Sequence, residues 1–411
     1  MDLELVTVGT ELLLGFTVDT NSAFLGLVLA EIGVRVARRT SVPDEPAAVR
    51  DAVREALGRS RLVITTGGLG PTKDDLSKQA VAEIFGLPLE FRPEIWESLA
   101  GRWARLGRKL SERNRCQAEV PRGATVLPNP LGTAPGLWIT GTPGEVVMLP
   151  GVPSEMRGLV RNEVVPRLAA RSSGRVVRSL VLRTTGIPES ALAERLAPVE
   201  NQLAPLTLAY LPSLGGVDLR LTAWDLAPEP ADQLLRAAAD RLRGPIGEHC
   251  YGEGETDLAE VLLDACRAKR LTLAVAESCT GGMVGERITA IPGSSDVFRG
   301  GVIAYANGVK ESALGVPARI LEVEGAVSEG TVRAMAEAAR GQLQASLAIA
   351  VSGVAGPDGG SAEKPVGTVW FGFAGPSGAD AERFVFPGSR QEIRIRASQH
   401  ALFGLLRRAR G

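Results

Sequence analysis

Short apolar runs alternate with amphipathic segments at the start of the chain, and this order predicts strands that alternate with helices. Residues 3–8, 34–38 and 61–66 are runs of the length and composition that buried strands have. Residues 20–32 and 45–57 lie between these runs and place their apolar positions at helical spacing. We therefore predict an N-terminal doubly wound α/β domain with a parallel sheet.

The pattern changes near residue 176, where strands become more frequent than helices. The predicted order is strand 176–186, helix 187–196, strands 207–212 and 217–223, and helix 231–242. This βαββα order is typical of a small α+β module. Residues 244–255 hold few apolar residues and four glycines, so we predict a linker there.

Alternation of strands and helices returns after the predicted linker and indicates a second α/β layer structure. The predicted elements are helix 257–268, strand 271–276, strand 300–305, helix 327–342, strands 347–352, 367–373 and 382–386, and a last helix from residue 391. We therefore expect a multidomain α/β protein with three parts, residues 1–170, 175–247 and 256–411.

Composition narrows the classes of function. The 411 residues carry a net charge of −1, so no global basic field favours nucleic acid as a partner. Met1 leads directly into a strand-like run, and no apolar run approaches the roughly 20 residues that span a bilayer. We expect a cytoplasmic protein with no membrane partner. The four cysteines form no CxxC pair, so neither a disulfide framework nor a thiolate zinc site is indicated.

A turn between strand 271–276 and the next helix is the strongest candidate for a nucleophile. Ser278 would project from the carboxyl end of a buried strand, beside backbone N–H groups at a helix start that could stabilise an oxyanion or a phosphate. The alternative is that Gly281 and Gly282 only make a tight turn and that Ser278 caps the helix. The flanking glycines of a nucleophile elbow are absent.

The scarcity of histidine and lysine limits the choice of a base. The only histidines are His249 and His400, so a Ser-His-Asp triad has few candidates. Six lysines stand among 46 basic residues, and lysine can act as a base whereas arginine cannot. Lys310 follows the end of strand 300–305 and is expected on the same side of the sheet as Ser278, although an ordinary surface lysine is the alternative.

A glycine-rich loop after strand 61–66 indicates a phosphate site with a metal. Its glycines let backbone amides close on phosphate oxygens, and the carboxylates of Asp74 and Asp75 at a helix start can hold a divalent cation. The predicted ligand-binding residues here are Gly67, Gly68, Gly70 and Thr72. The spacing is neither that of a P-loop nor that of a dinucleotide fingerprint. The alternative is a capped turn in which both carboxylates only interact favourably with the helix dipole and bind no metal.

Further loops are expected to meet at the same crevice, because loops at the strand ends of an open parallel sheet converge. Two glycine- and proline-rich segments flank the strand-like runs 137–140 and 145–148. The additional residues predicted to line the crevice are Thr10, Glu11, Asn21, Gly132 and Thr133.

The N-terminal motifs TVGTELLLG, DTNS, TTGGLGPTKDD, NPLGTAPG and LPGVP, in this order, resemble the CinA family of competence/damage-inducible proteins. The fold of that domain resembles molybdopterin-binding proteins of the MogA and MoeA type. The resemblance implies an ADP-ribose pyrophosphatase that needs a divalent cation (Mg, Mn or Co) and releases AMP and ribose 5-phosphate. The residues themselves do not select ADP-ribose over a molybdopterin.

The motifs AESCTGG, GGVIAYANGVK, SGVAGPDGG, KPVGTVW and GSRQEIRIRAS resemble the C-terminal domain of the same family, which also occurs alone as the nicotinamide mononucleotide deamidase PncC. This resemblance implies that Ser278 attacks the carboxamide, that Lys310 is the base and that Tyr305 relays or orients a proton, without a cofactor. Cys279 is a rival nucleophile that we rank below the serine. The residues expected to bind substrate are Thr280, Gly281, Gly282, Gly353, Gly356, Thr368, and Arg394 or Arg396.

Members of the CinA family carry a KH-like middle domain. Residues 175–247 lack a GxxG clamp and a basic or aromatic RNA surface, so we expect a spacer or dimerisation domain and a homodimer. The combined prediction is a hydrolase of pyridine-nucleotide recycling that acts on nicotinamide mononucleotide and ADP-ribose. The alternative is a nucleotide- or pterin-binding protein with a non-catalytic N-terminal crevice and a middle module that docks a partner.

Overall fold

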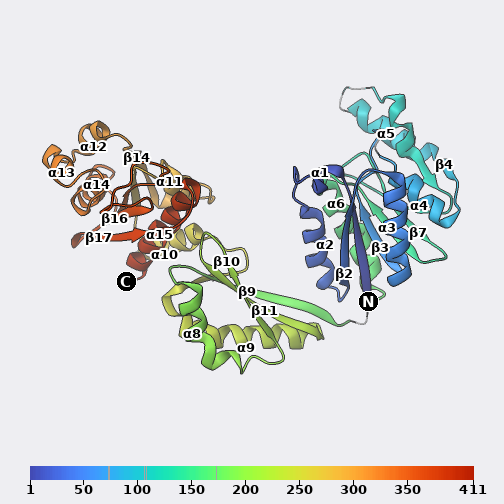
Figure 1. Ribbon diagram of the computed structural model, residues 1–411, viewed down its shortest axis with the longest axis horizontal. Coiled ribbons are helices and arrows are strands. Elements are labelled where there is room, and N and C mark those ends of the chain that lie inside the picture. The colour runs from blue at the N-terminus through green and yellow to red at the C-terminus, as the bar shows by residue number, and fades with distance from the viewer. Residues whose placement is uncertain (73–74, 106, 108, 173) are drawn as a thin grey trace. The chain divides into compact units, whose positions relative to one another are not determined.

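The computed structural model describes residues 1–72, 75–105, 107, 109–172 and 174–411 (Figure 1). Its contacts divide the chain into two compact units, residues 1–178 with 223–233, and residues 179–222 with 234–411. No helix in the described part of the chain combines the length and the apolar character needed to cross a membrane.

The first unit is built on a six-stranded sheet with the order β2-β1-β3-β8-β7-β6. Its elements are β1 (Asp2–Val8), α1 (Thr10–Leu13), α2 (Thr20–Ala30), β2 (Arg35–Val42), α3 (Pro46–Arg59), β3 (Leu62–Thr66), α4 (Ser77–Phe85), β4 (Leu89–Phe91), α5 (Pro93–Arg105), η1 (Glu112–Ala118), β5 (Glu119–Pro121), β6 (Thr125–Leu127), β7 (Gly136–Thr140), β8 (Glu145–Leu149), α6 (Pro153–Leu159), η2 (Val160–Val164) and α7 (Val165–Ala169). The predicted doubly wound α/β architecture is confirmed.

The three strands that predicted a parallel sheet are parallel, but the sheet also has antiparallel strands at one edge. Strands β1, β2, β3 and β8 run parallel, but β7 is antiparallel to β8 and β6 is antiparallel to β7. The register pairs Leu137 with Met148, so the start of β7 lies beside the carboxyl end of β8. The loop before β7 therefore reaches the same edge as the loops after the parallel strands, as the sequence analysis expected.

Helices cover both faces of this sheet because residues on each strand alternate between two cores (Figure 1). Leu3 and Leu5 pack with residues of α2 and α6. Val6 and Val8 pack with residues of α3 and α4. All four positions are buried, which accounts for the largely apolar run that predicted β1.

The middle module contains a four-stranded sheet with the order β10-β11-β9-β12. Its elements are β9 (Val176–Thr184), α8 (Glu189–Glu200), β10 (Thr207–Pro212), β11 (Val217–Leu226), α9 (Pro228–Ile246), η3 (Gly247–His249) and β12 (Cys250–Glu253). The predicted linker at residues 244–255 is wrong. Helix α9 extends to Ile246, and β12 pairs antiparallel with β9, so this segment completes the sheet. Tyr251 of β12 is buried against the C-terminal core.

The C-terminal domain has a five-stranded sheet with the order β14-β13-β15-β16-β17. Its elements are α10 (Leu258–Lys269), β13 (Leu273–Glu277), α11 (Met283–Thr289), η4 (Ser294–Asp296), β14 (Phe298–Ile303), α12 (Asn307–Leu314), α13 (Ala318–Val323), α14 (Glu329–Gln342), β15 (Leu347–Gly353), β16 (Thr368–Gly375), β17 (Gly378–Val385) and α15 (Arg390–Arg410). Strands β13, β14 and β15 are parallel, so their carboxyl ends lie at one edge.

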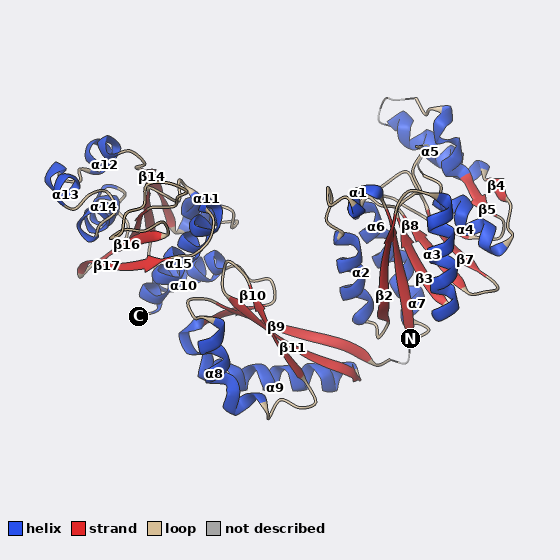
Figure 2. Cartoon of the chain, viewed as in Figure 1, coloured by secondary structure: helices blue, strands red, loops and turns tan. Residues whose placement is uncertain are grey.

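Residue size differs between the two faces of this sheet, and helices cover both faces (Figure 2). Leu273 and Val275 pack with residues of α10 and α15, whereas Ala274 and Ala276 pack with residues of α14. A Cβ atom added at Gly372 of β16 would lie 2.2 Å from the carbonyl oxygen of Val332. The small residues therefore let α14 pack directly against the sheet backbone.

Candidate active site

The side chain of Glu277 holds the turn that contains Ser278. The buried Glu277 carboxylate accepts hydrogen bonds from the amides of Gly282 (3.0 Å), Val284 (3.1 Å) and Gly285 (2.8 Å) at the start of α11. The helix dipole stabilises an anion at this position, and the carboxylate accepts hydrogen bonds from amides that would otherwise lack a partner. Sequence reasoning assigned no role to Glu277, because its partners are backbone groups.

The structure does not support Gly281 and Gly282 as amide donors to a substrate. The Gly282 amide is held by Glu277, and the Gly281 amide donates to the Ser278 carbonyl at 3.1 Å. Both glycines have positive φ values, 59° and 98°, which only glycine adopts readily. Their conformational freedom shapes the turn that presents Ser278.

Lys310 lies next to the Ser278 hydroxyl, as the sequence predicted. Its side chain is 1% exposed, and its Nζ lies 3.2 Å from Ser278 Oγ. Nζ also donates to the carbonyl oxygens of Ala304 and Tyr305, both at 2.9 Å. Burial lowers the pKa of the Lys310 ammonium from its ordinary value, because desolvation disfavours the charged form. The pair joins the end of β13 to helix α12.

Cys279 has the properties of a core thiol. It is 5% exposed, and burial raises the pKa of its thiol to about 12. The thiolate is the reactive form of cysteine, so this thiol is inert near neutral pH. The geometry therefore favours Ser278 over Cys279 as the nucleophile.

A cavity of about 190 Å³ opens beside Ser278. Its lining residues come from four loops and helix starts: Ser278, Cys279, Tyr305, Lys310, Ala326, Val327, Ser352, Gly353, Ala355 and Arg390. Gly353 was predicted to contribute to this site, and Gly356 lies in the loop that follows it. The Ser352 hydroxyl donates to the Ala326 carbonyl at 2.7 Å and so joins two of the segments that line the cavity.

Arg390 is a site residue that the sequence analysis missed. It donates to the Gly356 carbonyl at 2.6 Å and to the Tyr305 hydroxyl at 3.0 Å. The last helix was expected from residue 391, one position too late to include it. Ser389 and Glu392 form a capping box that places the helix start at Arg390, and the S-x-x-E pattern could have revealed it.

Tyr305 lines the cavity, but its hydroxyl is held by Arg390. The side chain is 59% exposed. Within the described residues, Lys310 Nζ bonds to the carbonyl of Tyr305 and not to its hydroxyl. The predicted proton relay through the Tyr305 hydroxyl therefore stays a prediction.

The two predicted phosphate-binding arginines of α15 occupy different places. Arg394 donates to the Thr280 carbonyl at 2.8 Å and so belongs to the Ser278 turn. Arg396 lines a separate cavity, and the structure does not bring it to Ser278. The hydroxyl oxygens of Thr280 and Thr368 are buried and have no hydrogen-bond partner among the described residues.

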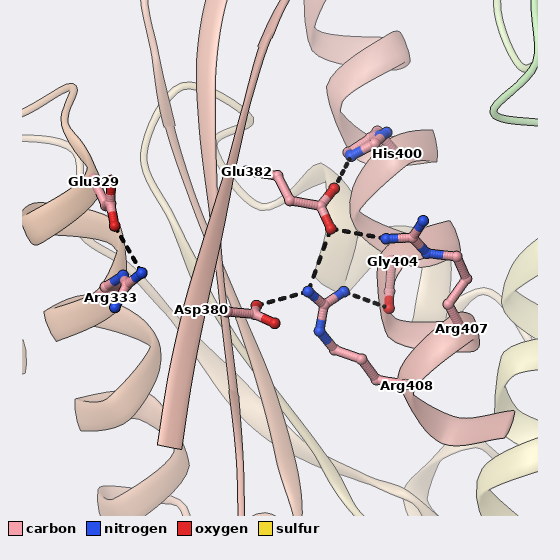
Figure 3. A network of polar contacts seen from close by, with 8 residues as sticks. All are labelled: Glu329, Arg333, Asp380, Glu382, His400, Gly404, Arg407 and Arg408. Carbon is pink, nitrogen blue, oxygen red and sulfur yellow. Dashed lines mark hydrogen bonds and ion pairs between the residues drawn. The ribbon is translucent and has the colours of Figure 1, made fainter. Parts of the chain in front are cut away.

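Both histidines lie away from the Ser278 cavity. His400 packs on Phe384 with ring centroids 4.0 Å apart, and its Nε2 lies 3.1 Å from Glu382 (Figure 3). This contact helps to lower the pKa of the Glu382 carboxyl to about 2. His249 bonds through Nδ1 to the Thr185 carbonyl at 3.0 Å. His400 is therefore engaged in packing and in an ion pair with Glu382.

The glycine-rich loop of the N-terminal domain is shaped by close backbone contacts. A Cβ atom added to Gly67 would lie 2.2 Å from the carbonyl oxygen of Val8, and one added to Gly68 would lie 2.0 Å from Ser77 Oγ. Asp75 accepts a hydrogen bond from the Thr72 amide at 2.8 Å. At Gly70, a Cβ atom would lie 2.6 Å from the Asp75 carboxylate. The Asp75 carboxylate therefore lies close to both Gly70 and Thr72.

The predicted metal site is only half described. Asp74 lies outside the described residues, so only Asp75 of the pair can be placed. Among the residues that the structure describes, no group of three or more His, Cys, Asp or Glu side chains could hold a metal ion. Metal binding by Asp74 and Asp75 stays a prediction.

The other predicted crevice residues lie at the starts of helices α1 and α2, near the carboxyl edge of the sheet. Thr10 donates from its amide to Asp44 at 2.8 Å, and Asn21 donates from Nδ2 to the Gly151 carbonyl at 2.8 Å. Glu11 is exposed. Sequence reasoning did not anticipate Asp44, which joins the loops after β1 and β2.

Gly132 and Thr133 line a cavity of about 680 Å³ beside α5. Arg102 of α5 donates to the Gly132 carbonyl at 2.7 Å, and Thr133 accepts from Gln117 at 3.2 Å. None of the described residues between Gly67 and Asp75 lines this cavity. The structure therefore brings the predicted N-terminal residues to one edge but into two groups.

These features define a multidomain protein with two α/β domains, a middle module and a buried serine–lysine pair. Residues 4–170 match the family described as a probable molybdopterin binding domain, residues 179–252 the damage-inducible protein CinA KH domain, and residues 255–409 the CinA C-terminal domain. The chain belongs to the CinA family.

Full-length relatives carry the same family name. The chain is 52% identical over 411 residues to a CinA-like protein of Gemmatimonas aurantiaca, covering 99% of this chain and 96% of the relative. It is 45% identical over 416 residues to a putative competence-damage inducible protein of Symbiobacterium thermophilum, covering 98% and 97%. The crystal structure of the competence/damage inducible protein CihA from Agrobacterium tumefaciens is 38% identical, with a TM-score of 0.36, and covers 36% of this chain and 92% of that chain.

Proposed function

We propose that the C-terminal domain is an amidohydrolase that converts nicotinamide mononucleotide to nicotinate mononucleotide and ammonia. The observation that carries this proposal is the buried Lys310 Nζ at 3.2 Å from Ser278 Oγ. A serine hydroxyl needs a base to remove its proton, and the pKa of Lys310 is lowered by burial.

The hydrogen bonds around Nζ orient a neutral lysine for this role. The carbonyl oxygens of Ala304 and Tyr305 can only accept hydrogen bonds, so they take the two N–H groups of a neutral amine. The remaining lone pair then faces Ser278, whose hydroxyl donates to it. Lys310 is thus held in the geometry of a base that has Ser278 as its proton donor.

The proposed reaction has two stages that share one base. Ser278 Oγ bonds to the carboxamide carbon and gives its proton to Lys310. Collapse of the tetrahedral intermediate breaks the C–N bond, and Lys310 returns the proton to the leaving ammonia. A water molecule then gives a proton to Lys310 and bonds to the carbonyl carbon of the Ser278 ester. The ester bond to Ser278 Oγ breaks, Lys310 returns the proton to Ser278 Oγ, and nicotinate mononucleotide is released.

The size and charge of the site support a nucleotide substrate. The cavity of about 190 Å³ is smaller than the ~300–1,000 Å³ of whole-ligand pockets, so it suits the ring and carboxamide of a larger molecule. Arg390 lines the cavity, and Arg394 contacts the Ser278 turn. A guanidinium group binds phosphate with two parallel hydrogen bonds, so we propose that these arginines hold the substrate phosphate.

Incubation with nicotinamide mononucleotide tests this function. We expect wild-type protein to release ammonia and nicotinate mononucleotide in equal amounts, and Ser278→Ala to release neither. Absence of ammonia with wild-type protein, or release by both proteins, would contradict the proposal.

We propose that the N-terminal domain hydrolyses ADP-ribose to AMP and ribose 5-phosphate. Support comes from membership of the CinA family and from the loops that meet at one edge of the sheet. Asp74 and Asp75 would hold a divalent cation, which would neutralise pyrophosphate charge when bound. The backbone of Gly67, Gly68 and Gly70 would approach the phosphates.

The matching experiment measures AMP released from ADP-ribose with Mg²⁺, Mn²⁺ or Co²⁺. We expect release with at least one of these cations. The alternative, a nucleotide- or pterin-binding domain without turnover, predicts tight binding and no AMP with any of them.

A further inference from the structure

A second cavity in the C-terminal unit is larger than the Ser278 cavity and has no role in the proposed reaction. Its volume is about 590 Å³, within the range of ~300–1,000 Å³ that holds whole small molecules. One wall comes from the turns that follow β9 and β10 of the middle module. The other wall comes from β17 and α15 of the C-terminal domain.

Flat aromatic rings form much of the C-terminal wall. Phe384 and Phe386 are stacked, with ring centroids 5.9 Å apart and an interplanar angle of 11°. The Phe384 side chain remains 40% exposed, although it is a large apolar residue. His249 and Phe403 form a second stacked pair, with centroids 5.8 Å apart. Such surfaces favour the face of another planar ring.

Arg396 brings a positive charge to this cavity. Its Nε atom is buried and has no hydrogen-bond partner among the described residues. A buried donor that lacks a partner is costly, and a guanidinium group is suited to a carboxylate or a phosphate. On the same helix, hydrogen bonds with Ser389 and, to a smaller extent, the charge of Arg396 lower the pKa of Glu392.

The other charged groups of the cavity are engaged or lie at its rim. Glu382 contacts His400 at 3.1 Å, Arg407 at 2.8 Å and Arg408 at 3.3 Å, so its negative charge is matched (Figure 3). Glu189 begins α8 and is exposed. Arg396 is therefore the lining charge, within the described part of the chain, that remains available for an acidic ligand.

We propose that this cavity binds a mononucleotide-sized ligand that carries a planar aromatic ring and an acidic group. The ring packs on Phe384 and Phe386, and the acidic group binds Arg396. Residues two positions apart on a helix point roughly 200° apart, so Arg394 faces the Ser278 turn while Arg396 faces this cavity. The site is thus separate from the Ser278 cavity.

Photolabelling of the full chain with 8-azido-AMP tests this proposal. We expect covalent label on peptides that contain Phe384 and Phe386 or residues 185–189, and loss of that label when excess AMP competes. Competition by nicotinate, which has a carboxylate and no phosphate, distinguishes a carboxylate site from a phosphate site. Label confined to peptides around Ser278, or absence of specific label, would overturn the proposal.

Arg394 supplies a matched control because it is the same residue type on the same helix. Arg396→Gln should reduce labelling of the Phe384 peptide at least tenfold, whereas Arg394→Gln should leave it unchanged. Phe384→Leu keeps an apolar side chain but removes the flat ring, so it should also reduce labelling. Circular dichroism confirms that each variant is folded. Unchanged labelling in folded Arg396→Gln would overturn the assignment.

Discussion

Replacement of Lys310 by arginine tests whether this lysine acts as a catalytic base or has only a structural role. Arginine keeps the positive charge and can still donate to the carbonyls of Ala304 and Tyr305. It cannot become neutral near pH 7, so it cannot accept the proton of Ser278 at 3.2 Å. Lys310→Arg should therefore lose general-base catalysis.

The expected loss follows from the role of the base. Removal of a general base lowers kcat by ~10²–10⁴-fold, which is about 3–5.5 kcal/mol of transition-state stabilisation. Because Ser278 and Lys310 would act as one unit, the double variant Ser278→Ala/Lys310→Arg should lose about as much activity as Ser278→Ala alone. Independent roles would instead give losses that multiply.

The assay is initial-rate release of ammonia from nicotinamide mononucleotide, with thermal melting as a control for folding. Lys310 is 1% exposed, so Lys310→Met, which is similar in length, accompanies Lys310→Arg as an uncharged variant. Both variants should be inactive while folded. A folded Lys310→Arg protein that keeps kcat within tenfold of wild type would refute the base assignment.

Three further predictions concern the pH profile and the neighbouring residues. Burial lowers the pKa of Lys310, so the neutral base forms at lower pH than in free lysine, and kcat should rise with pH through one apparent pKa below roughly 10.4; a flat profile would contradict this. Cys279→Ala should keep ammonia release, because burial raises the pKa of this thiol to about 12; an inactive folded variant would revive the thiol nucleophile. Asp74→Asn/Asp75→Asn should lower AMP release from ADP-ribose by orders of magnitude and spare ammonia release, and equal loss of both activities would indicate misfolding or a shared site.

The strands were predictable where burial on both faces leaves a short, mostly apolar run. Strand β13 was expected at residues 271–276 and spans Leu273–Glu277, and β3 was expected at 61–66 and spans Leu62–Thr66. Strand β12 was missed because it has four residues, one of them glycine, and is held by pairing with β9. The residues of β12 alone do not indicate that it pairs with β9, which is distant in the sequence.

Dependence on distant contacts also explains which parts of the candidate site could be predicted. Ser278 and Lys310 were predicted as a pair because each follows a strand end, and parallel strands bring their carboxyl ends together. The role of Glu277 was not predictable, because it binds amides of the turn that it shapes. The choice between Arg394 and Arg396 could not be made from the sequence, since the face of a helix that meets a site depends on packing around α15; Arg394 contacts the Ser278 turn, whereas Arg396 lines another cavity.

Ammonia release by Ser278→Ala is the most direct test of the central claim, that Ser278 paired with Lys310 hydrolyses a nucleotide carboxamide. Wild-type protein and the folded variant are incubated with nicotinamide mononucleotide under the same conditions. The proposed mechanism predicts ammonia from wild type and none above background from Ser278→Ala, with substrate binding retained in the variant. Ammonia release by folded Ser278→Ala at the wild-type rate would contradict it.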